Sequence, residues 1–500
     1  MAEPRTPLGD GVMKLAFGML VVCTASALAH VGSPDVFFEG RAGAYPVSVV
    51  IRPPSVIPGV AQVDVRVTAN GVESVSVVPF PLTGRASKYP PTPDIAKRSD
   101  SDSHLFTSSV WLMAFGSFQV RVDIEGTQGH GTVAIPIPSV SSEIKRMDPG
   151  LGWILAGLIS LLVIGAVSIA GAAARESTLP EGERASPSTR RRSRVVMAGT
   201  ALGVVSLLAL GTEWWGAEAN SYRDHIYKPP SMTAHISDGI LNLQLGGPSL
   251  ALRPPANDFL PDHGHLMHLF VVSMPRMDLM WHLHPDLVGN GEFSGNLPPL
   301  PAGRYKLFAD VVRASGFPET PSADLEVPFA IQGRPLSGDD AAGTALPLAA
   351  FDANRTIAAL KDGYRMVRLT NAGPLPTKQM HHFTFEVQDG TGRPATDLEP
   401  YMGMAAHAEF LRDDASVFAH VHPSGTVPMA ALGLTAEGSA MPAGHTMLSS
   451  HTMHQAALPA QFAFPYGFPK AGRYRMFIQI QRAGVPQTAS FDFDVRDRIL

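Results

Sequence analysis

The middle of the chain contains the feature that most restricts its fold, a long stretch without charge. Residues 151–173 carry no charged side chain over 23 positions. A helix rises about 1.5 Å per residue, so this stretch is long enough to cross a hydrocarbon layer of about 30 Å. A second apolar run covers residues 195–215 and ends with two tryptophans, which are typical of membrane interfaces. The sequence therefore predicts two transmembrane helices, at 151–173 and 195–215, joined as a hairpin.

Charge and an N-terminal export signal predict the orientation of this hairpin. The connecting segment 174–194 contains six arginines and three glutamates. Because positively charged loops stay in the cytoplasm, both large flanking segments should face outward. Residues 1–29 combine Lys14, an apolar run and a small-residue cleavage sequence that ends at Ala29, as in a signal peptide. Cys23, the only cysteine, lies in this segment, so the exported chain should have neither disulfides nor thiolate metal ligands.

Composition and hydrophobic patterning predict that the outer segments are rich in β-strands. The 47 glycines and 44 prolines disfavour long soluble helices. Short alternating runs separated by turn residues predict one sandwich at 30–145 and two more at 216–335 and 350–500. The expected fold is mainly β, with three Ig-like or cupredoxin-like β-sandwich domains plus a two-helix transmembrane hairpin. A net charge of −5 without long charged blocks argues against nucleic-acid binding.

An internal repeat relates the two C-terminal sandwiches. The first copy contains MHLF at 267–270, HLHP at 282–285 and GRYKLFADVVRA at 303–314. The second copy contains AHAEF at 406–410, HVHP at 420–423 and GRYRMFIQIQRA at 472–483. The second copy is longer, and its extra residues include a tract rich in methionine and histidine at 441–454.

Each repeat places three histidines on one face of a predicted hairpin. Alternate side chains of a strand share a face, so both histidines of each HxHP motif point the same way. A turn centred on 274–276 places His268 opposite His282 in the first copy. A turn at 413–414 places His407 opposite His420 in the second. The sequence thus predicts two convergent sets, which consist of His268, His282 and His284 and of His407, His420 and His422.

Three converging imidazoles are a recurrent way to bind zinc or copper. The alternative is a structural network in which the ring nitrogens bond to backbone carbonyls. Thioethers select Cu(I) and thiolates are missing, so copper is the expected cofactor, with zinc as the alternative. Further copper ligands are predicted at Met402, Met404, His445, Met447, His451, Met453 and His454. His263 and His265, with Asp262, either widen the first site or form a polar loop.

The N-terminal sandwich offers one more potential copper ligand. Signal-peptide cleavage after Ala29 makes His30 the first residue, and a terminal amine together with its own imidazole can chelate copper. His104 or His130 would then supply the third nitrogen. The alternative is an ordinary exposed terminal histidine.

The pattern MHLF…HLHP…LPAGRYKLFADVV resembles that of bacterial secreted or membrane-attached proteins of the YtkA-like and CopC-like group. These are β-sandwich modules associated with copper or heavy-metal handling outside the cytoplasm. The resemblance extends over about 260–330 and 380–497. It implies ligands at the two HxH pairs, with His268 and His407 as their partners. The N-terminal module shares with CopC-like domains the potential first-residue histidine, His30, but lacks a matching downstream Asp-x-His.

Together these features predict a membrane-anchored copper-binding protein that sequesters, buffers or passes on copper without catalysing a reaction. We expect it in a bacterial inner membrane, with its N- and C-terminal domains in the periplasm or outside the cell. Its expected partners are the metal ion, the membrane and a protein that donates or accepts copper. A metalloenzyme with three histidines and an open metal position is one alternative. A structural or adhesive array of sandwiches without metal is the other.

Overall fold

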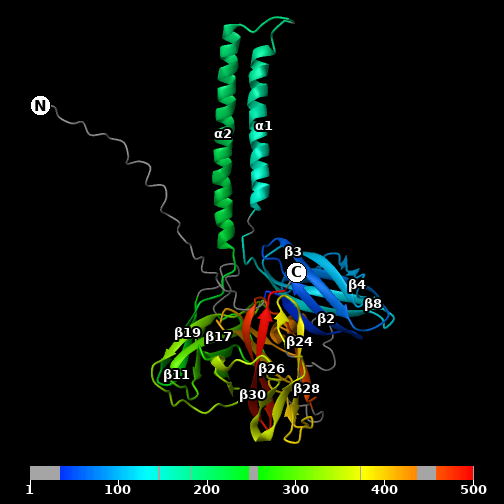
Figure 1. Cartoon of the computed structure of the whole chain (residues 1–500), viewed down its shortest axis with the longest axis vertical. Coiled ribbons are helices and arrows are strands. Elements are labelled where there is room, and N and C mark those ends of the chain that lie inside the picture. The colour runs from blue at the N-terminus through cyan, green and yellow to red at the C-terminus, as the bar shows by residue number, and fades with distance from the viewer. Residues whose placement is uncertain are drawn as a thin grey trace, which may run out of the picture.

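The structure is a computed structural model, and it describes residues 34–144, 147–180, 182–246, 257–371, 373–435 and 458–498. The described chain is mainly β, with three double-sheet domains and a pair of long helices that projects away from them (Figure 1). This arrangement confirms the expected fold class of β-sandwiches plus a helical hairpin. The predicted signal peptide, residues 1–29, lies outside the described residues.

The N-terminal domain consists of two sheets that enclose an aliphatic core. Their strand orders are β1-β2-β3-β7-β6 and β5-β4-β8-β9. The elements are β1 (Val36–Ala42), β2 (Tyr45–Arg52), β3 (Gly59–Val67), β4 (Val72–Pro81), the 3₁₀ helix η1 (Arg85–Lys88), β5 (Asp94–Ile95), β6 (Lys97–Arg98), β7 (Leu105–Leu112), β8 (Gly116–Gly126) and β9 (Gly131–Ser139). Apolar side chains alternate inward along β3, because successive side chains of a strand point to opposite faces.

Two long helices, α1 (Pro149–Glu176) and α2 (Pro187–Asp224), follow the N-terminal domain. Each begins with a polar cap and a proline in the first turn. Asp148 accepts from the Leu151 amide, and Ser186 accepts from the Thr189 amide. Both helices are long and apolar enough to cross a membrane, and they bury almost none of their apolar surface in the protein. They approach closely at Gly171, where an added Cβ would lie 2.5 Å from Met197 Cγ.

The helices extend beyond the two predicted spans. α1 exceeds 151–173 at both ends, and α2 begins at residue 187 instead of 195. The connection therefore shortens from the predicted 174–194 to residues 177–186, and the arginines at 190–194 lie in the first turns of α2. Hydropathy marks the part of a helix that suits lipid, whereas the cap at Ser186 determines where α2 begins.

The second domain carries the first repeat. Its sheets have the orders β10-β11-β16-β15 and β12-β17-β13-β14-β20, and β18 and β19 also pair with β17. The strands are β10 (Met232–Ser237), β11 (Ile240–Leu245), β12 (Phe259–Leu260), β13 (His268–Met274), β14 (Leu279–Leu283), β15 (Asp286–Leu287), β16 (Glu292–Asn296), β17 (Gly303–Arg313), β18 (Pro318–Glu319), β19 (Ser322–Val327) and β20 (Ala341–Thr344).

The third domain carries the second repeat. Its sheets have the orders β21-β22-β24-β28 and β23-β30-β29-β26-β27, and β25 also pairs with β29. The elements are η2 (Leu348–Ala350), β21 (Ile357–Ala359), η3 (Lys361–Gly363), β22 (Arg365–Arg368), β23 (Leu375–Pro376), β24 (His381–Gln388), β25 (Leu398–Glu399), β26 (His407–Arg412), β27 (Phe418–Val421), α3 (Met429–Leu434), β28 (Gln461–Tyr466), β29 (Gly472–Arg482) and β30 (Val485–Arg496).

The two repeats pack face to face through equivalent strands. An apolar cluster joins β13, β14 and β17 to β26, β27 and β29, and Phe308 stacks on Phe418 with a ring-centroid distance of 4.4 Å. Matching positions of the two copies contribute from both sides, namely Val272 and Leu411, Met280 and Phe418, and Phe308 and Phe477. The interface therefore has approximate two-fold symmetry, as a self-complementary contact requires.

Both hairpins differ from the predicted register by two residues. The strand ladders pair His282 with Phe270 and His420 with Glu409, so the predicted pairings of these histidines with His268 and His407 are wrong. The turns close farther along the chain than expected. A shift of two residues keeps every side chain on its own face of the sheet. The predicted convergence of the histidines therefore survives the error in register.

A buried arginine of the second repeat connects the two repeats beneath this interface. Arg475 is fully buried on β29, and its guanidinium donates to both carboxylate oxygens of Asp492 at 2.8 and 3.1 Å. It also donates to the carbonyls of Met277 at 2.7 Å and Leu346 at 2.6 Å. One side chain thus connects the second repeat to a turn of the first repeat and to the linker between them.

We predict that Arg475→Met destabilises the protein by about 3–5 kcal/mol, because it leaves the Asp492 carboxylate buried without its partner. The matched control is Lys306→Met, at the equivalent position of the first repeat. Lys306 contacts Asp324, whose side chain is 85% exposed, and such pairs contribute about 0–1 kcal/mol. Urea unfolding of both variants measures the difference. Equal losses of stability in the two variants would contradict the role given to Arg475.

Candidate metal centre

Eight histidines gather at one end of the interface between the repeats. Their ring centroids lie 3.9 to 6.0 Å from those of neighbouring rings. The members are His263, His265, His268, His282, His284, His407, His420 and His422. β13 and β26 each begin with one of them, and β14 and β27 each contain one. Two more, His284 and His422, directly follow β14 and β27. Face-to-face packing of the two sheets therefore brings both predicted sets into one cluster.

The first predicted set forms a compact triplet. One ring nitrogen from each of His268, His282 and His284 lies within 4.8 Å of the others, and His268 Nδ1 is 3.0 Å from His282 Nε2. The remaining nitrogens face oxygen atoms. His268 Nε2 lies 3.0 Å from the Asp262 carbonyl oxygen. His282 Nδ1 lies 2.8 Å from Gln479 Oε1, and His284 Nδ1 lies 3.1 Å from Asp340 Oδ1. Histidines that bind metals commonly orient their second nitrogen in this way.

The second triplet has a different membership from the predicted one. His263, His407 and His422 each offer a nitrogen within 4.8 Å of the others, and His263 Nε2 lies 3.3 Å from His422 Nε2. His263 belongs to the first repeat, so this triplet spans the interface. His420, predicted in this set, lies between the two triplets, with its ring centroid 5.6 Å from that of His268 and 5.5 Å from that of His407.

Contacts between the repeats are reciprocal. Asp310 and Gln479 occupy the same position in the two GRY motifs. Gln479 of the second repeat contacts His282 Nδ1 of the first, while Asp310 of the first repeat lies 3.3 Å from His420 Nδ1 of the second. The Nε2 atom of His420 is buried without a hydrogen-bond partner. Each copy therefore orients the first HxH histidine of the other.

The loops before β13 and β26 are also equivalent. Short bridges close both, from Asp262 to His265 and from Tyr401 to Met404. The second residue of each loop has a positive φ, 51° at His263 and 50° at Met402, and a glycine follows. Met402 thus occupies in the second copy the position that His263 occupies in the first.

The two predicted methionine ligands have different surroundings. Met402 is buried in a cluster with Tyr401 and Ala341, and Ala341 pairs with His282 across the β14–β20 ladder. Met404 packs against the hydrophobic cluster that joins the N-terminal domain to α3 and its preceding loop. Of the two thioethers, Met402 is therefore the one that shares a buried cluster with the ladder partner of a first-triplet histidine.

Burial favours the neutral form of the six histidines that make up the two triplets. Loss of solvent, followed by the influence of neighbouring imidazoles, lowers the pKa values of His268, His282, His407 and His422 well below the ordinary value. Burial also lowers the pKa values of His263 and His284. Both ring nitrogens of His407 lack hydrogen-bond partners in the described structure. Neutral imidazole is the form that binds metals, so these rings are prepared as ligands.

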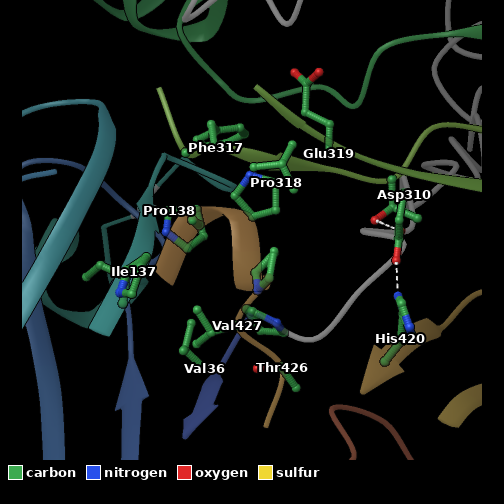
Figure 2. Close-up of a pocket in the computed structure, with 18 of the residues that line it drawn as sticks. Val36, Ile137, Pro138, Asp310, Phe317, Pro318, Glu319, His420, Thr426 and Val427 are labelled. Atoms are coloured by element: carbon green, nitrogen blue, oxygen red, sulfur yellow. Dashed lines mark hydrogen bonds and ion pairs between the residues drawn. The ribbon is translucent and has the colours of Figure 1, made fainter. Parts of the chain in front are cut away.

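A cavity of about 380 Å³ lies beside the cluster, where all three β domains meet (Figure 2). Its apolar wall includes Ile137 and Pro138 of the N-terminal domain, Phe317 of the second domain and Val427 of the third. Its histidine wall includes one member of each triplet, His268 and His422, together with the Asp310–His420 pair.

The remaining predicted ligands fall into two groups. His30, His445, Met447, His451, Met453 and His454 lie outside the described residues. His104 and His130 are described, and each has a partner within its own domain. His104 Nδ1 lies 2.9 Å from the Val67 carbonyl, and His130 Nδ1 lies 2.8 Å from Glu125 Oε1.

The sequence did not predict that His263 belongs to the second triplet. It also did not predict that Gln479 and Asp310 orient His282 and His420. Alignment of the two GRY motifs could have indicated Asp310 and Gln479. The two residues occupy equivalent positions of the repeats, on the strand that pairs with the first histidine of each set. For His263, the equivalence of the two loops could be seen in the sequences DHGH at 262–265 and YMGM at 401–404. Its contact with the other repeat requires the packing of the two domains, which no local pattern specifies.

Comparisons with known proteins give limited information. A family profile described as a domain of unknown function (DUF8832) matches residues 358–497. A search of curated proteins gave no match. Similar solved structures include a tetra-tandem repeat from the extending region of a large adhesion protein, with 8% identity and a TM-score of 0.15, over 88% of this chain and 71% of that chain.

Two further structures were also similar. Native alpha-2-macroglobulin from E. coli has 9% identity and a TM-score of 0.19, over 93% of this chain and 23% of that chain. A putative membrane anchored protein from Corynebacterium diphtheriae has 8% identity and a TM-score of 0.15, over 93% and 97% of the two chains. Similarity at this level supports no inference about function.

Proposed function

We propose that this chain is a membrane-anchored metal-binding protein that holds copper at the interface between its two repeats. The main evidence is the pair of histidine triplets, in each of which three ring nitrogens lie within 4.8 Å of one another. Three nitrogen ligands at this spacing need only small side-chain movements to reach the distance of about 2.0–2.1 Å typical of metal–imidazole bonds. Each triplet accepts one ion, so the expected content is two ions per chain.

Copper fits this set of ligands better than zinc. Repeat equivalence gives Met402 the position beside the first triplet that His263 has beside the second. Its burial against Ala341, the ladder partner of His282, agrees with that position. Soft thioether sulfur favours Cu(I), so a methionine next to three imidazoles supports copper at the first triplet. The second triplet offers imidazoles alone and suits either copper or zinc.

The helical hairpin supports a role at the outer face of a membrane. The arginines in the first turns of α2 lie at the end of the hairpin remote from the β domains (Figure 1). By the positive-inside rule this end is cytoplasmic. The β domains then lie in the periplasm of a bacterial inner membrane, or outside the cell. There the protein sequesters or buffers copper, or exchanges it with a donor or acceptor protein.

Metal content tests the proposal directly. We expect mass spectrometry of the purified full-length chain, loaded with copper and dialysed, to give two ions per chain. His282→Ala and His407→Ala should each remove one ion, because each variant breaks one triplet. His235→Ala, a change to an exposed histidine on β10, should leave both ions in place. A wild-type chain that retains no metal would overturn the proposed function.

Met402 tests the identity of the metal. Loss of a group that merely orients a ligand weakens metal binding roughly 10- to 100-fold, so Met402→Leu should weaken binding of one Cu(I) ion at least tenfold. Zinc affinity should change little, because zinc gains less from a thioether. Met404→Leu is the matched control. Competition titrations with a Cu(I) chelator measure the effect, and equal Cu(I) affinities in both variants would remove the argument for copper.

The neutral histidines predict how the metal-free protein responds to acid. Their pKa values are lowered in the folded chain, so below about pH 6.5 the unfolded chain binds protons that the folded chain does not. Each such histidine then lowers the free energy of unfolding by up to about 1.4 kcal/mol per pH unit. The thermal midpoint should therefore be steady from pH 8 to 7 and fall below pH 6.5.

Two substitutions separate this effect from general acid sensitivity. His407→Gln should make the decline with acid shallower, because it removes one buried imidazole. His130→Gln should leave the slope unchanged, because His130 is exposed. Calorimetric scans between pH 8 and 5 provide the measurement, and a midpoint that stays constant down to pH 5 would show that the histidines do not control stability.

A further inference from the structure

The cavity beside the histidine cluster has no assigned role in the proposed function. It lies between all three β domains and has a volume of about 380 Å³, enough for roughly ten water molecules. Residues 227 and 229, which follow α2, also line it. The N-terminal domain contributes Val36, Ile137 and Pro138, although this domain supplies no histidine to the cluster (Figure 2).

The cavity reaches both triplets. His268 of the first triplet and His422 of the second are among the residues that line it. His265 and His420 line the same wall. An ion in the cavity is therefore adjacent to histidines of both triplets, and it does not have to pass through the packed interface between the two repeats.

Charge in the cavity favours cations. Five carboxylates line it, and none of its described lining residues is a lysine or an arginine; the carboxylates are Asp35, Glu143, Asp262, Asp310 and Glu319. Burial raises the pKa values of Asp35 and Glu319, and Arg313 contacts Glu319 at 2.6 Å, so these two carboxyls contribute less negative charge. Asp310 accepts from the Thr320 hydroxyl and faces His420. Apolar walls of low dielectric constant focus the field of such carboxylates and raise the local concentration of cations.

His420 provides a second, independent indication of a metal ligand in this wall. Its side chain is 5% exposed, and its Nε2 atom has no hydrogen-bond partner. Its Nδ1 atom faces the Asp310 carboxylate at 3.3 Å (Figure 2). A carboxylate that orients one nitrogen of a histidine while the other stays free is the arrangement found in metal-binding histidines.

We propose that this cavity is the path by which metal cations reach both triplets, with the Asp310–His420 pair as their first contact. The inference rests on the proposed function, because it requires that the triplets bind metal. It gives the N-terminal domain a role, since that domain forms one wall of the path. The cargo is a hydrated transition-metal cation, and anions are excluded by the carboxylates.

Stopped-flow loading of the metal-free full-length protein with Cu²⁺ in detergent tests the path. Trp281 adjoins His282 and reports binding through fluorescence quenching. Asp310→Asn should slow association about tenfold at low salt and weaken its dependence on ionic strength. Pro138→Trp, a change to a partly exposed cavity residue, should slow loading by a similar factor through obstruction. Both variants should still reach two ions per chain.

Matched controls separate the path from general effects. Asp324→Asn removes an exposed carboxylate from the same domain, and Pro81→Trp adds bulk at another partly exposed proline of the same sheet outside the cavity. Both should load at the wild-type rate. Unchanged rates in Asp310→Asn and Pro138→Trp overturn the path while the metal sites stand. Loss of an ion in Asp310→Asn also overturns it, because Asp310 is then a ligand. No uptake of either Cu²⁺ or Cu(I) by the wild type refutes the proposed function itself.

Discussion

The apolar contact between the two repeats is the interaction on which the centre depends. Phe308, Phe418 and their neighbours close the two sheets onto each other, and this contact removes the adjacent histidines from water. Burying a large apolar side chain contributes about 1.5–3 kcal/mol, which offsets the cost of removing several imidazoles from solvent. Burial at this contact also lowers the pKa values of the triplet histidines, which favours their neutral form. Without this packing the two HxH motifs would be exposed strand ends in separate domains.

The sequence was sufficient to predict the architecture because its signals were local. Uncharged stretches predicted the helices, turn residues and alternation predicted the strands, and the repeated motifs predicted the histidines on one face of each hairpin. The hairpin registers were wrong because they depended on where each turn closes, which hydrophobic alternation does not determine. A two-residue error leaves side chains on the same face, so the ring nitrogens of His268, His282 and His284 still converge despite it.

The second triplet could not be predicted because its third member crosses between domains. His263 lies on a loop of the first repeat and meets His407 and His422 after the two domains have packed. Sequence spacing constrains neighbours within one hairpin but not across an interface. The same limit applies to Gln479, which lies in the other repeat from the histidine that it orients.

Differences between the two copies determine how the two sites can differ in chemistry. The histidines of the HxH motifs and the strand-initial histidines are common to both, so each repeat presents similar imidazole geometry. The surrounding positions diverge, with Met402 in place of His263 and Gln479 in place of Asp310. Glu409 replaces Phe270, and burial raises the pKa of its carboxyl well above the ordinary value.

These substitutions act on the sites through the two-fold interface. A neutral amide orients His282, whereas a carboxylate faces His420, and a carboxylate makes the imidazole that it contacts a stronger donor to a metal. His263 supplies an extra imidazole to the second triplet, and Met402 occupies the equivalent position of the other repeat. In the proposed function, a duplicated hairpin packed against its own copy holds two ions in nearly equivalent surroundings, and each ion has a different affinity because each site takes its distinguishing residues from the opposite repeat.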